Sequence, residues 1–224
     1  MIRPDMATRL AYVCTDADSS SACLKQLLVA ATNRSVNRIT VDGDTSTNDA
    51  FIVAAPGQAG NAPIEDPASE EAALLLAGLT SVAQSLAQAI VRDGEGATKF
   101  VTVAVAGGAD EAECLEVAYT VAESPLVKTA LFASDPNWGR LAMAIGRAVV
   151  GNLDPAGVQV FFDDVQVMQD GLMAPDYSEE AGARVLAAEE FTVRIELGRG
   201  SADAEIWASD LSYEYVRINA EYRT

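Results

Sequence analysis

Thr8 is the residue of this sequence with the most distinctive possible reactivity, because a threonine at a newly cut chain start can act as a nucleophile. Its own α-amine, with a reference pKa of about 8, can then serve as the general base for the hydroxyl. The sequence contains no histidine, which excludes Ser-His-Asp and Cys-His catalysis and histidine-ligated metals within the chain. An internal threonine in a strand is ordinarily structural, so this chemistry depends on cleavage of the bond between Ala7 and Thr8.

A second group of polar side chains lies at residues 42–49, with the sequence DGDTSTND. Its opening is similar to an EF-hand loop and to a phosphatase aspartyl motif. The EF-hand fails because Thr47 stands where glycine is required and Val53 where glutamate is required. No other motif supports a phosphatase. A loop of this composition either caps its own backbone or lines a pocket, and composition favours neither.

Other single residues carry weak signals. Glu95 lies between two glycines and could present a carboxylate to a ligand, although a solvated charge at a helix end is the commoner case. Trp138 is more typical of a core or interface aromatic than of a ligand-stacking residue. Asn219 and Thr224 lie near the chain end and indicate nothing by themselves. The three cysteines have no CxxC spacing, so neither a disulfide framework nor a metal site is expected.

Composition limits the classes of partner. The formal net charge of −18 argues against nucleic acid and anionic membrane surfaces, which need Lys and Arg on the protein. The longest apolar stretches, such as residues 74–79 and 141–145, are short of the roughly 20 residues of a membrane span. The first residues show neither a signal peptide nor a transit peptide pattern, so a cytoplasmic location is expected by default.

Hydrophobic patterning predicts strands and helices separated by turn residues. The expected strands are 8–15, 38–41, 50–55, 99–106, 158–168, 191–197 and 204–211, and the expected helices are 22–33, 69–92, 110–123, 138–149 and 178–189. Ser69 is expected to cap the longest helix. Strands predominate after residues 152–156, which predicts a nucleophile-bearing lobe, 1–151, and a smaller strand-rich lobe, 152–224, in an α+β or layered α/β fold.

Six segments in order resemble the ornithine acetyltransferase family across nearly the whole chain. They are MIRPDMAT followed by Asp16-Ala17, NRITVDGDTSTND at 37–49, DGEGATK at 93–99, SPLVKTA at 124–130, SDPNWGR at 134–140, and INAEYRT at 218–224. The resemblance corresponds to the C-terminal, or β chain, portion of that family. It implies a layered α/β sandwich of the self-processing ornithine acetyltransferase/aminopeptidase type, in two lobes.

The resemblance also implies an activity. Family members cleave themselves at the bond that corresponds to Ala7–Thr8, giving an α chain and a β chain that starts with the nucleophile. The implied enzyme is a glutamate N-acetyltransferase, which moves acetyl from N-acetylornithine to glutamate through an acetyl-Thr8 intermediate in arginine biosynthesis. By motif, Glu95, Asn219 and Thr224 contact the amino-acid substrate. No cofactor is implied, although some members accept acetyl-CoA as a donor.

The implied assembly contains two α and two β chains, and the α half carries the Thr-Gly oxyanion donors. Because one such donor contributes about 10²–10³ in rate, this chain alone is expected to be inactive. Arg9 stands where the family is expected to have Met. Two alternatives remain open at this point: a self-processing hydrolase such as an aminopeptidase, and an inactive split half that serves as an interaction subunit.

Overall fold

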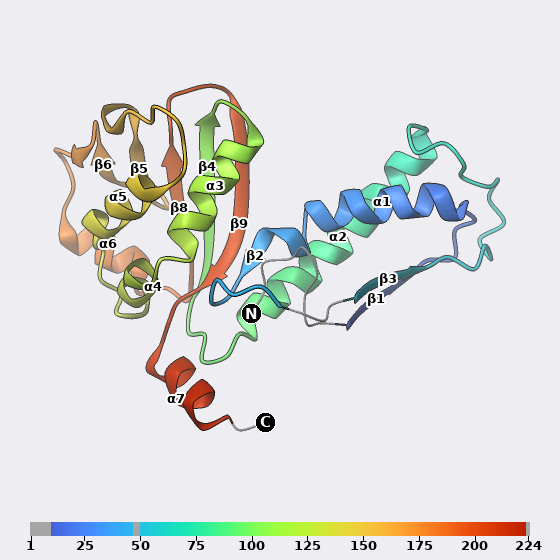
Figure 1. Cartoon of the computed structure of the whole chain (residues 1–224), viewed down its shortest axis with the longest axis horizontal. Helices are drawn as coiled ribbons and strands as arrows, with labels where there is room; N and C mark the ends of the chain where they lie inside the picture. The colour runs from blue at the N-terminus through green and yellow to red at the C-terminus, as the bar shows by residue number, and fades with distance from the viewer. Residues whose placement is uncertain (1–9, 47–49, 223–224) are drawn as a thin grey trace. The chain divides into compact units, whose positions relative to one another are not determined.

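The computed structural model describes residues 10–46 and 50–222, which fall into two compact units. Unit 1 comprises residues up to 39 together with 44–90, and unit 2 comprises residues 40–43 and 91–224. Helices and strands are mixed in both units (Figure 1), which confirms the expected α/β class.

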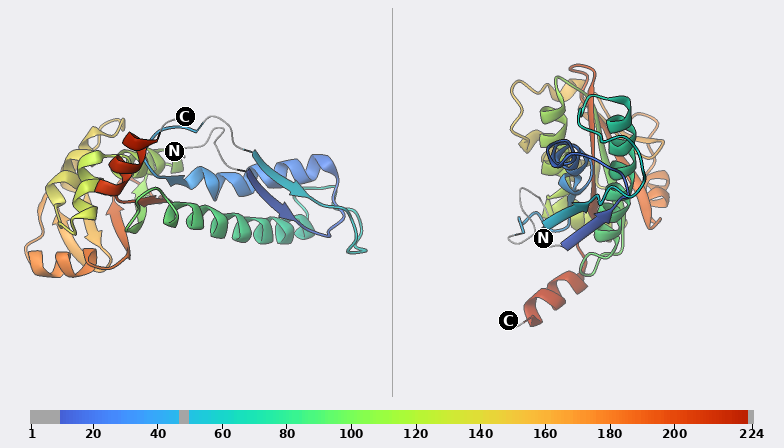
Figure 2. Two further views of the ribbon diagram at one scale, coloured as in Figure 1. Left: turned by 90° about the horizontal axis from the view of Figure 1, so that it is seen from below. Right: turned by 90° about the vertical axis from the view of Figure 1, so that its right-hand side faces the viewer.

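Unit 1 contains two parallel strands, β1 (Leu10–Cys14) and β3 (Ala50–Ala54), which lie side by side (Figure 2). Helices α1 (Ser21–Asn33) and α2 (Glu70–Arg92) supply most of its core, and Val13 and Val53 pack against that core from the strands. Their neighbours Tyr12 and Ile52 pair across the strands and remain 61% and 44% exposed. Since successive strand residues point to opposite faces, one face of this sheet is packed and the described residues leave the other uncovered.

Both helices of unit 1 begin at a serine cap. The hydroxyl of Ser20 accepts a hydrogen bond from Cys23 N at 3.2 Å, and that of Ser69 accepts one from Ala72 N at 3.1 Å. Each cap satisfies a backbone donor that the first helical turn leaves without a partner. The predicted cap at Ser69 is confirmed.

Helix α2 has the length and composition of a membrane span, which the apolar stretches of the sequence did not indicate. An 18-residue window within it has a mean hydropathy of 1.6, and 22% of that window is buried. Core helices of water-soluble proteins have the same length and composition, so this one helix is weak evidence for a membrane. Its residues Ala72 and Leu79 belong to the core of unit 1.

Unit 2 is organised around a seven-stranded sheet in the order β2-β9-β4-β8-β5-β6-β7. The strands are β2 (Ile39–Thr40), β4 (Phe100–Gly108), β5 (Gln159–Phe162), β6 (Val165–Gln169), β7 (Leu172–Met173), β8 (Glu190–Glu196) and β9 (Ala202–Ser209). Strand β4 pairs parallel with β8 and antiparallel with β9, so that Val103 lies between Val193 and Ile206. Each such buried apolar side chain stabilises the fold by about 1.5–3 kcal/mol.

Helices α3 (Glu111–Ala122), α4 (Pro125–Phe132), α5 (Trp138–Arg147) and α6 (Glu179–Leu186) complete the core of unit 2 (Figure 1). Alternate residues of β4, including Val101 and Val105, are buried with Val117 of α3 in one cluster. A last helix, α7 (Tyr213–Glu221), follows β9 and has no buried residue.

Most of the expected elements are present within a few residues of their predicted ends. The expected strand 158–168 is wrong, because a turn at Asp163 and Asp164 splits it into the hairpin β5–β6. Asp163 has a φ of 46°, a left-handed conformation that aspartate tolerates better than most residues. Helices α4 and α7 were not predicted.

The compact units also differ from the lobes expected from the sequence. The expected division between residues 151 and 152 falls inside unit 2. Strand β5 follows this point in the chain, and through β8 it belongs to the same sheet as β4. Hydrogen bonding across one sheet therefore joins segments that composition separated.

Candidate functional site

Two of the residues singled out in the sequence, Glu95 and Asn219, meet in unit 2. Glu95 lies in the loop after α2, and Asn219 lies on α7. The amide Nδ2 of Asn219 donates a hydrogen bond to Oε2 of Glu95 at 2.9 Å. Both side chains are exposed, so the pair can be reached by a ligand.

The topology of the sheet explains why residues so distant in sequence meet. Strands β4 and β9 are antiparallel, and Phe100 at the start of β4 pairs with Ser209 at the end of β9. The loop before β4 and the segment after β9 therefore emerge at the same edge of the sheet. That edge carries both Glu95 and α7.

Side-chain hydrogen bonds fix the start of α7 against this loop. The hydroxyl of Ser212 donates to the carbonyl oxygen of Gly96 at 2.6 Å and accepts from Tyr215 N at 3.3 Å as the helix cap. One turn later, Nδ2 of Asn219 also donates to the carbonyl oxygen of Tyr215 at 3.0 Å. The orientation of Asn219 therefore depends on how α7 begins.

Asp210 anchors the connection that leads into α7. Its Oδ1 accepts hydrogen bonds from the backbone N–H groups of Thr98 and Lys99 at 2.8 and 2.9 Å, and its Oδ2 accepts one from the hydroxyl of Thr98 at 2.6 Å. The residue is 3% exposed. A buried carboxylate with three donors is well compensated for its loss of water, which makes this a rigid link between β9 and the start of β4.

Gly96 has no room for a side chain. Its φ is 66°, a left-handed conformation that favours glycine, and a Cβ atom there would lie 2.5 Å from Tyr215 N. The backbone of α7 therefore approaches the loop of Glu95 so closely that only glycine fits at position 96 without a shift of the surrounding atoms.

Gly96→Ala is consequently expected to destabilise the protein by about 2–4 kcal/mol, from the left-handed backbone and the contact with α7 together. A loss of that size lowers the melting temperature by roughly 5–15 °C in scanning fluorimetry. Gly60→Ala is the matched control, because Gly60 has a φ of 73° and a Cβ atom there would meet no described atom within 4 Å. Equal losses in the two variants would contradict a close approach at Gly96.

The described part of the polar loop, residues 42–46, also contacts this site. Oδ2 of Asp42 accepts a hydrogen bond from the hydroxyl of Tyr215 at 3.2 Å. The two interpretations that composition left open were a loop that caps itself and a loop that lines a pocket. Within the described part of the loop, Asp42 bonds to the first turn of α7.

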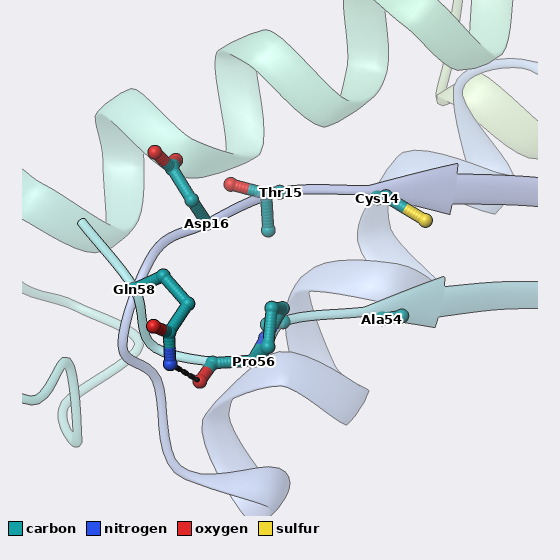
Figure 3. Close-up of a pocket in the computed structure, with 7 residues that line it drawn as sticks. Cys14, Thr15, Asp16, Ala54, Pro56 and Gln58 are labelled. Atoms are coloured by element: carbon teal, nitrogen blue, oxygen red, sulfur yellow. Dashed lines mark hydrogen bonds between the residues drawn. The ribbon is translucent and has the colours of Figure 1, made fainter.

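A pocket in unit 1 lies at the carboxyl ends of β1 and β3, with a cavity volume of about 810 Å³. Its lining residues are Cys14, Thr15, Asp16, Ala54, Ala55, Pro56 and Gln58 (Figure 3). Gln58 is held by a hydrogen bond from Nε2 to the carbonyl oxygen of Pro56 at 3.2 Å. Neither Glu95 nor Asn219 lines this pocket. Among the described residues, no group of three or more acidic or cysteine side chains could hold a metal ion.

The remaining predicted site residues, Ala7, Thr8 and Thr224, lie outside the described residues. Of the predicted set, the structure thus brings together Glu95 and Asn219. It adds Ser212, Tyr215 and Asp210, which sequence reasoning missed. The sequence contained one signal for the helix α7 that carries Tyr215: Arg217 pairs with Glu214 and Glu221 at the i,i+3 and i,i+4 spacings typical of a helix.

Comparison with known proteins gives consistent matches over the whole chain. The arginine biosynthesis bifunctional proteins ArgJ of Pseudomonas fluorescens (strain Pf0-1) and of Pseudomonas syringae pv. tomato are each 54% identical over 224 residues, which is 100% of this chain and 55% of each relative. The ArgJ of Psychrobacter arcticus is 52% identical over the same extent. The chain therefore spans about half the length of the curated relatives it matches.

A solved structure agrees with these relatives. The crystal structure of the arginine biosynthesis bifunctional protein ArgJ from Bacillus halodurans matches with a TM-score of 0.90 and 38% sequence identity, covering 96% of this chain and 100% of that chain. The model of the ArgJ family matches residues 1–224. These findings confirm the resemblance read from the six motifs, and the chain belongs to the ArgJ family.

Proposed function

We propose that this chain is the nucleophile-bearing portion of an arginine biosynthesis enzyme that transfers acetyl from N-acetylornithine to glutamate. The observation that carries the proposal is the contact between Asn219 and Glu95. It joins two residues that the motifs assign to the amino-acid substrate, although they are 124 positions apart. The names of the relatives support the place of the reaction in arginine biosynthesis.

In the proposed mechanism, cleavage of the Ala7–Thr8 bond first frees the α-amine of Thr8. This amine takes the proton of the Thr8 hydroxyl as the oxygen attacks the acetyl carbonyl of N-acetylornithine. The C–N bond of the amide then breaks, the leaving amine receives the proton, and ornithine departs from an acetyl-Thr8 ester. The neutral amine of glutamate attacks this ester, the bond between the acetyl carbon and the Thr8 oxygen breaks, and the proton lost by the attacking amine passes through the α-amine of Thr8 to that oxygen. N-acetylglutamate is released and the hydroxyl is restored.

Glu95 is proposed to pair with the side-chain ammonium group of N-acetylornithine. Its Oε2 is already oriented by Asn219, so a substrate ammonium can approach a carboxylate whose position is largely set in advance. Thr224 is proposed as a further substrate contact by motif. An electrostatic contact of this kind fixes the substrate without taking part in proton transfer.

The proposal includes a partner half that supplies the oxyanion donors, in an assembly of two α and two β chains. Two coverage values support it: this chain covers the full length of the solved ArgJ chain but 55% of the curated relatives. Each half-reaction passes through a tetrahedral oxyanion, and each donor to that oxyanion contributes about 10²–10³ in rate.

The uncovered face of the β1–β3 sheet supports the partner half independently. This face carries the side chains of Tyr12, Cys14, Ile52 and Ala54, all of them exposed in this chain. Parallel strands are usually covered on both faces, because their residues are apolar on both sides. An apolar sheet face of this kind suits packing against another protein segment.

Ile52→Lys is expected to weaken association with the partner half by at least about 30-fold, because it places a charge in the buried centre of the proposed contact. The measurement is the fraction of partner half that copurifies with this chain during size-exclusion chromatography. Val29→Lys is the control, since Val29 is 53% exposed on α1 and does not belong to the sheet face. Unchanged copurification of the Ile52→Lys variant would contradict a partner on this face.

Mass spectrometry of the co-expressed halves tests the proposed function itself. The expected result is a chain that starts at Thr8 and gains one acetyl group when N-acetylornithine is added. Transfer of that acetyl to water in preference to glutamate would instead indicate a hydrolase. Absence of both the Thr8-started chain and the adduct would leave a non-catalytic interaction subunit.

Three further aspects belong to the proposal. No cofactor is required, because threonine and its amine supply the nucleophile and the base. Acetyl-CoA is a candidate second acetyl donor, since any activated acetyl group can form the same ester. A cytoplasmic location follows from the biosynthetic role that the names of the relatives give.

A further inference from the structure

Lys128 is a lysine with a buried charge that the proposed mechanism does not use. It lies on α4 and is 2% exposed. Its Nζ donates a hydrogen bond to the carbonyl oxygen of Ser209, and its own carbonyl oxygen accepts one from Leu211 N at 3.3 Å. Lysine is almost never fully buried without compensating groups, so its surroundings need an explanation.

Three carboxylates from different segments attract this ammonium group. They are Asp42 after β2, Glu123 at the end of α3, and Asp210 after β9. Burial lowers the pKa of Lys128 to about 8, while attraction to these carboxylates acts in the opposite direction. The positive charge of Lys128 thus attracts three negative charges, of which that of Asp210 is buried.

Two of these carboxylates hold the segments that position the candidate site. Asp210 accepts hydrogen bonds from Thr98 and Lys99, which lie between the loop of Glu95 and β4. Asp42 accepts a hydrogen bond from the hydroxyl of Tyr215. The carbonyl oxygen of Tyr215 in turn accepts a hydrogen bond from the side-chain amide of Asn219. Electrostatic attraction from Lys128, followed by these hydrogen bonds, therefore leads to the pair of Glu95 and Asn219.

The third carboxylate supports the turn beside Asp42. The Cβ of Glu123 lies 3.4 Å from the position that a Cβ on Gly43 would occupy. The side chain of Glu123 therefore packs directly against the backbone that follows Asp42. The charged groups that act on Lys128 follow β2, α3 and β9, and the hydroxyl of Tyr215 on α7 donates a hydrogen bond to one of them, Asp42.

We propose that Lys128 is a positioning residue whose positive charge holds Asp42 and Asp210 in place, and through them aligns Asn219 and Glu95 for the substrate. This inference rests on the proposed function for its kinetic consequence. Its structural consequence, the ordering of α7 by the charge of Lys128, can be measured in the absence of activity.

Loss of the Lys128 charge at high pH has opposite expected effects on global stability and on the positioning of the site. The pKa of Lys128 in the folded protein is about 8, below its ordinary value of 10.5. Between these values the unfolded chain binds more protons than the folded chain, so this group adds stability as the pH rises. Loss of the charge over the same range releases Asp42 and Asp210 from their common partner. Positioning therefore weakens while this contribution to global stability increases.

The kinetic test measures KM for N-acetylornithine between pH 7 and 9.5 in the enzyme assembled with its partner half. In the unaltered enzyme KM is expected to rise by about three- to tenfold above pH 8. Lys128→Arg keeps the charge throughout this range and is expected to remove the rise. Lys128→Met is expected to have a KM about tenfold higher at every pH, with kcat less affected. Lys25→Met, on the exposed surface of α1, is the control and should behave like the unaltered enzyme.

Hydrogen exchange of α7, corrected for intrinsic rates, gives the second readout in the same assembly. Protection of residues 213–221 is expected to fall above pH 8 in the unaltered protein and at pH 7 in Tyr215→Phe, which lacks the hydroxyl bound to Asp42. A pH-independent KM with unchanged protection of α7 overturns the inference, as does a rise in KM that persists in Lys128→Arg.

If Lys128→Met or Lys128→Arg does not fold, the measurements on the unaltered protein and on Tyr215→Phe still test the inference. If the enzyme transfers no acetyl, the exchange data test Lys128 separately from the proposed function.

Discussion

Thr8→Ala is expected to lower kcat by at least about 10⁴-fold and to prevent the appearance of a chain that starts at residue 8. Removal of the hydroxyl removes the atom that accepts the acetyl group. Unlike the loss of a binding contact, this defect cannot be overcome by a higher substrate concentration. The expected mass spectrum therefore shows an uncut precursor that gains no acetyl group from N-acetylornithine.

Two variants separate the hydroxyl from other effects of the substitution. Thr8→Ser retains the hydroxyl and is expected to keep both cleavage and acetylation, at reduced rates. Thr32→Val removes a hydroxyl that bonds to the carbonyl oxygen of Leu28 in α1, so it controls for the loss of a threonine hydrogen bond elsewhere. An acetyl adduct that persists in Thr8→Ala would assign the nucleophile to another residue.

The elements with clear periodicity were predictable because their exposed and buried faces leave a regular pattern. The start of helix α2 was predictable from a second kind of signal, because Ser69 and the acidic residues that follow it are typical of a helix N-terminus. Helix α4 has no polar face to give a period, and its signal was instead Pro125 directly after Ser124, a pair typical of a helix start. The turn at Asp163 was missed because neither glycine nor asparagine marks it.

The candidate site was predictable by resemblance and not by local pattern. Glu95 and Asn219 are each ordinary exposed polar residues, and their contact exists because β4 and β9 are antiparallel neighbours. Strand order in a sheet depends on long-range packing, which periodicity along the chain does not record. For the same reason no pattern along the chain predicts the environment of Lys128, because the carboxylates that act on it come from three separate segments.

Glu95→Gln is expected to raise KM for N-acetylornithine by roughly 10- to 100-fold, the range for losing a charge-assisted hydrogen bond. The substitution preserves shape, and the glutamine carbonyl can still accept the hydrogen bond from Asn219, so the loop should keep its geometry. The change therefore isolates the charge. Asn219→Ala is expected to have a smaller effect, about three- to tenfold, because it removes a neutral hydrogen-bond donor and leaves the charge of the carboxylate in place. Glu65→Gln, an exposed residue in the loop before α2, is the matched control.

A change in the substrate tests the same contact from the other side. N-acetylnorvaline has the carbon chain of N-acetylornithine without the terminal ammonium group. If Glu95 pairs with that ammonium, the unaltered enzyme should discriminate between the two donors by about 10- to 100-fold in kcat/KM, and Glu95→Gln should lose most of this discrimination. The variant and the analogue remove opposite partners of one interaction, so their effects on kcat/KM should not add. Additive effects would mean that the ammonium group binds elsewhere, and that the carboxylate of Glu95 acts on another part of the substrate.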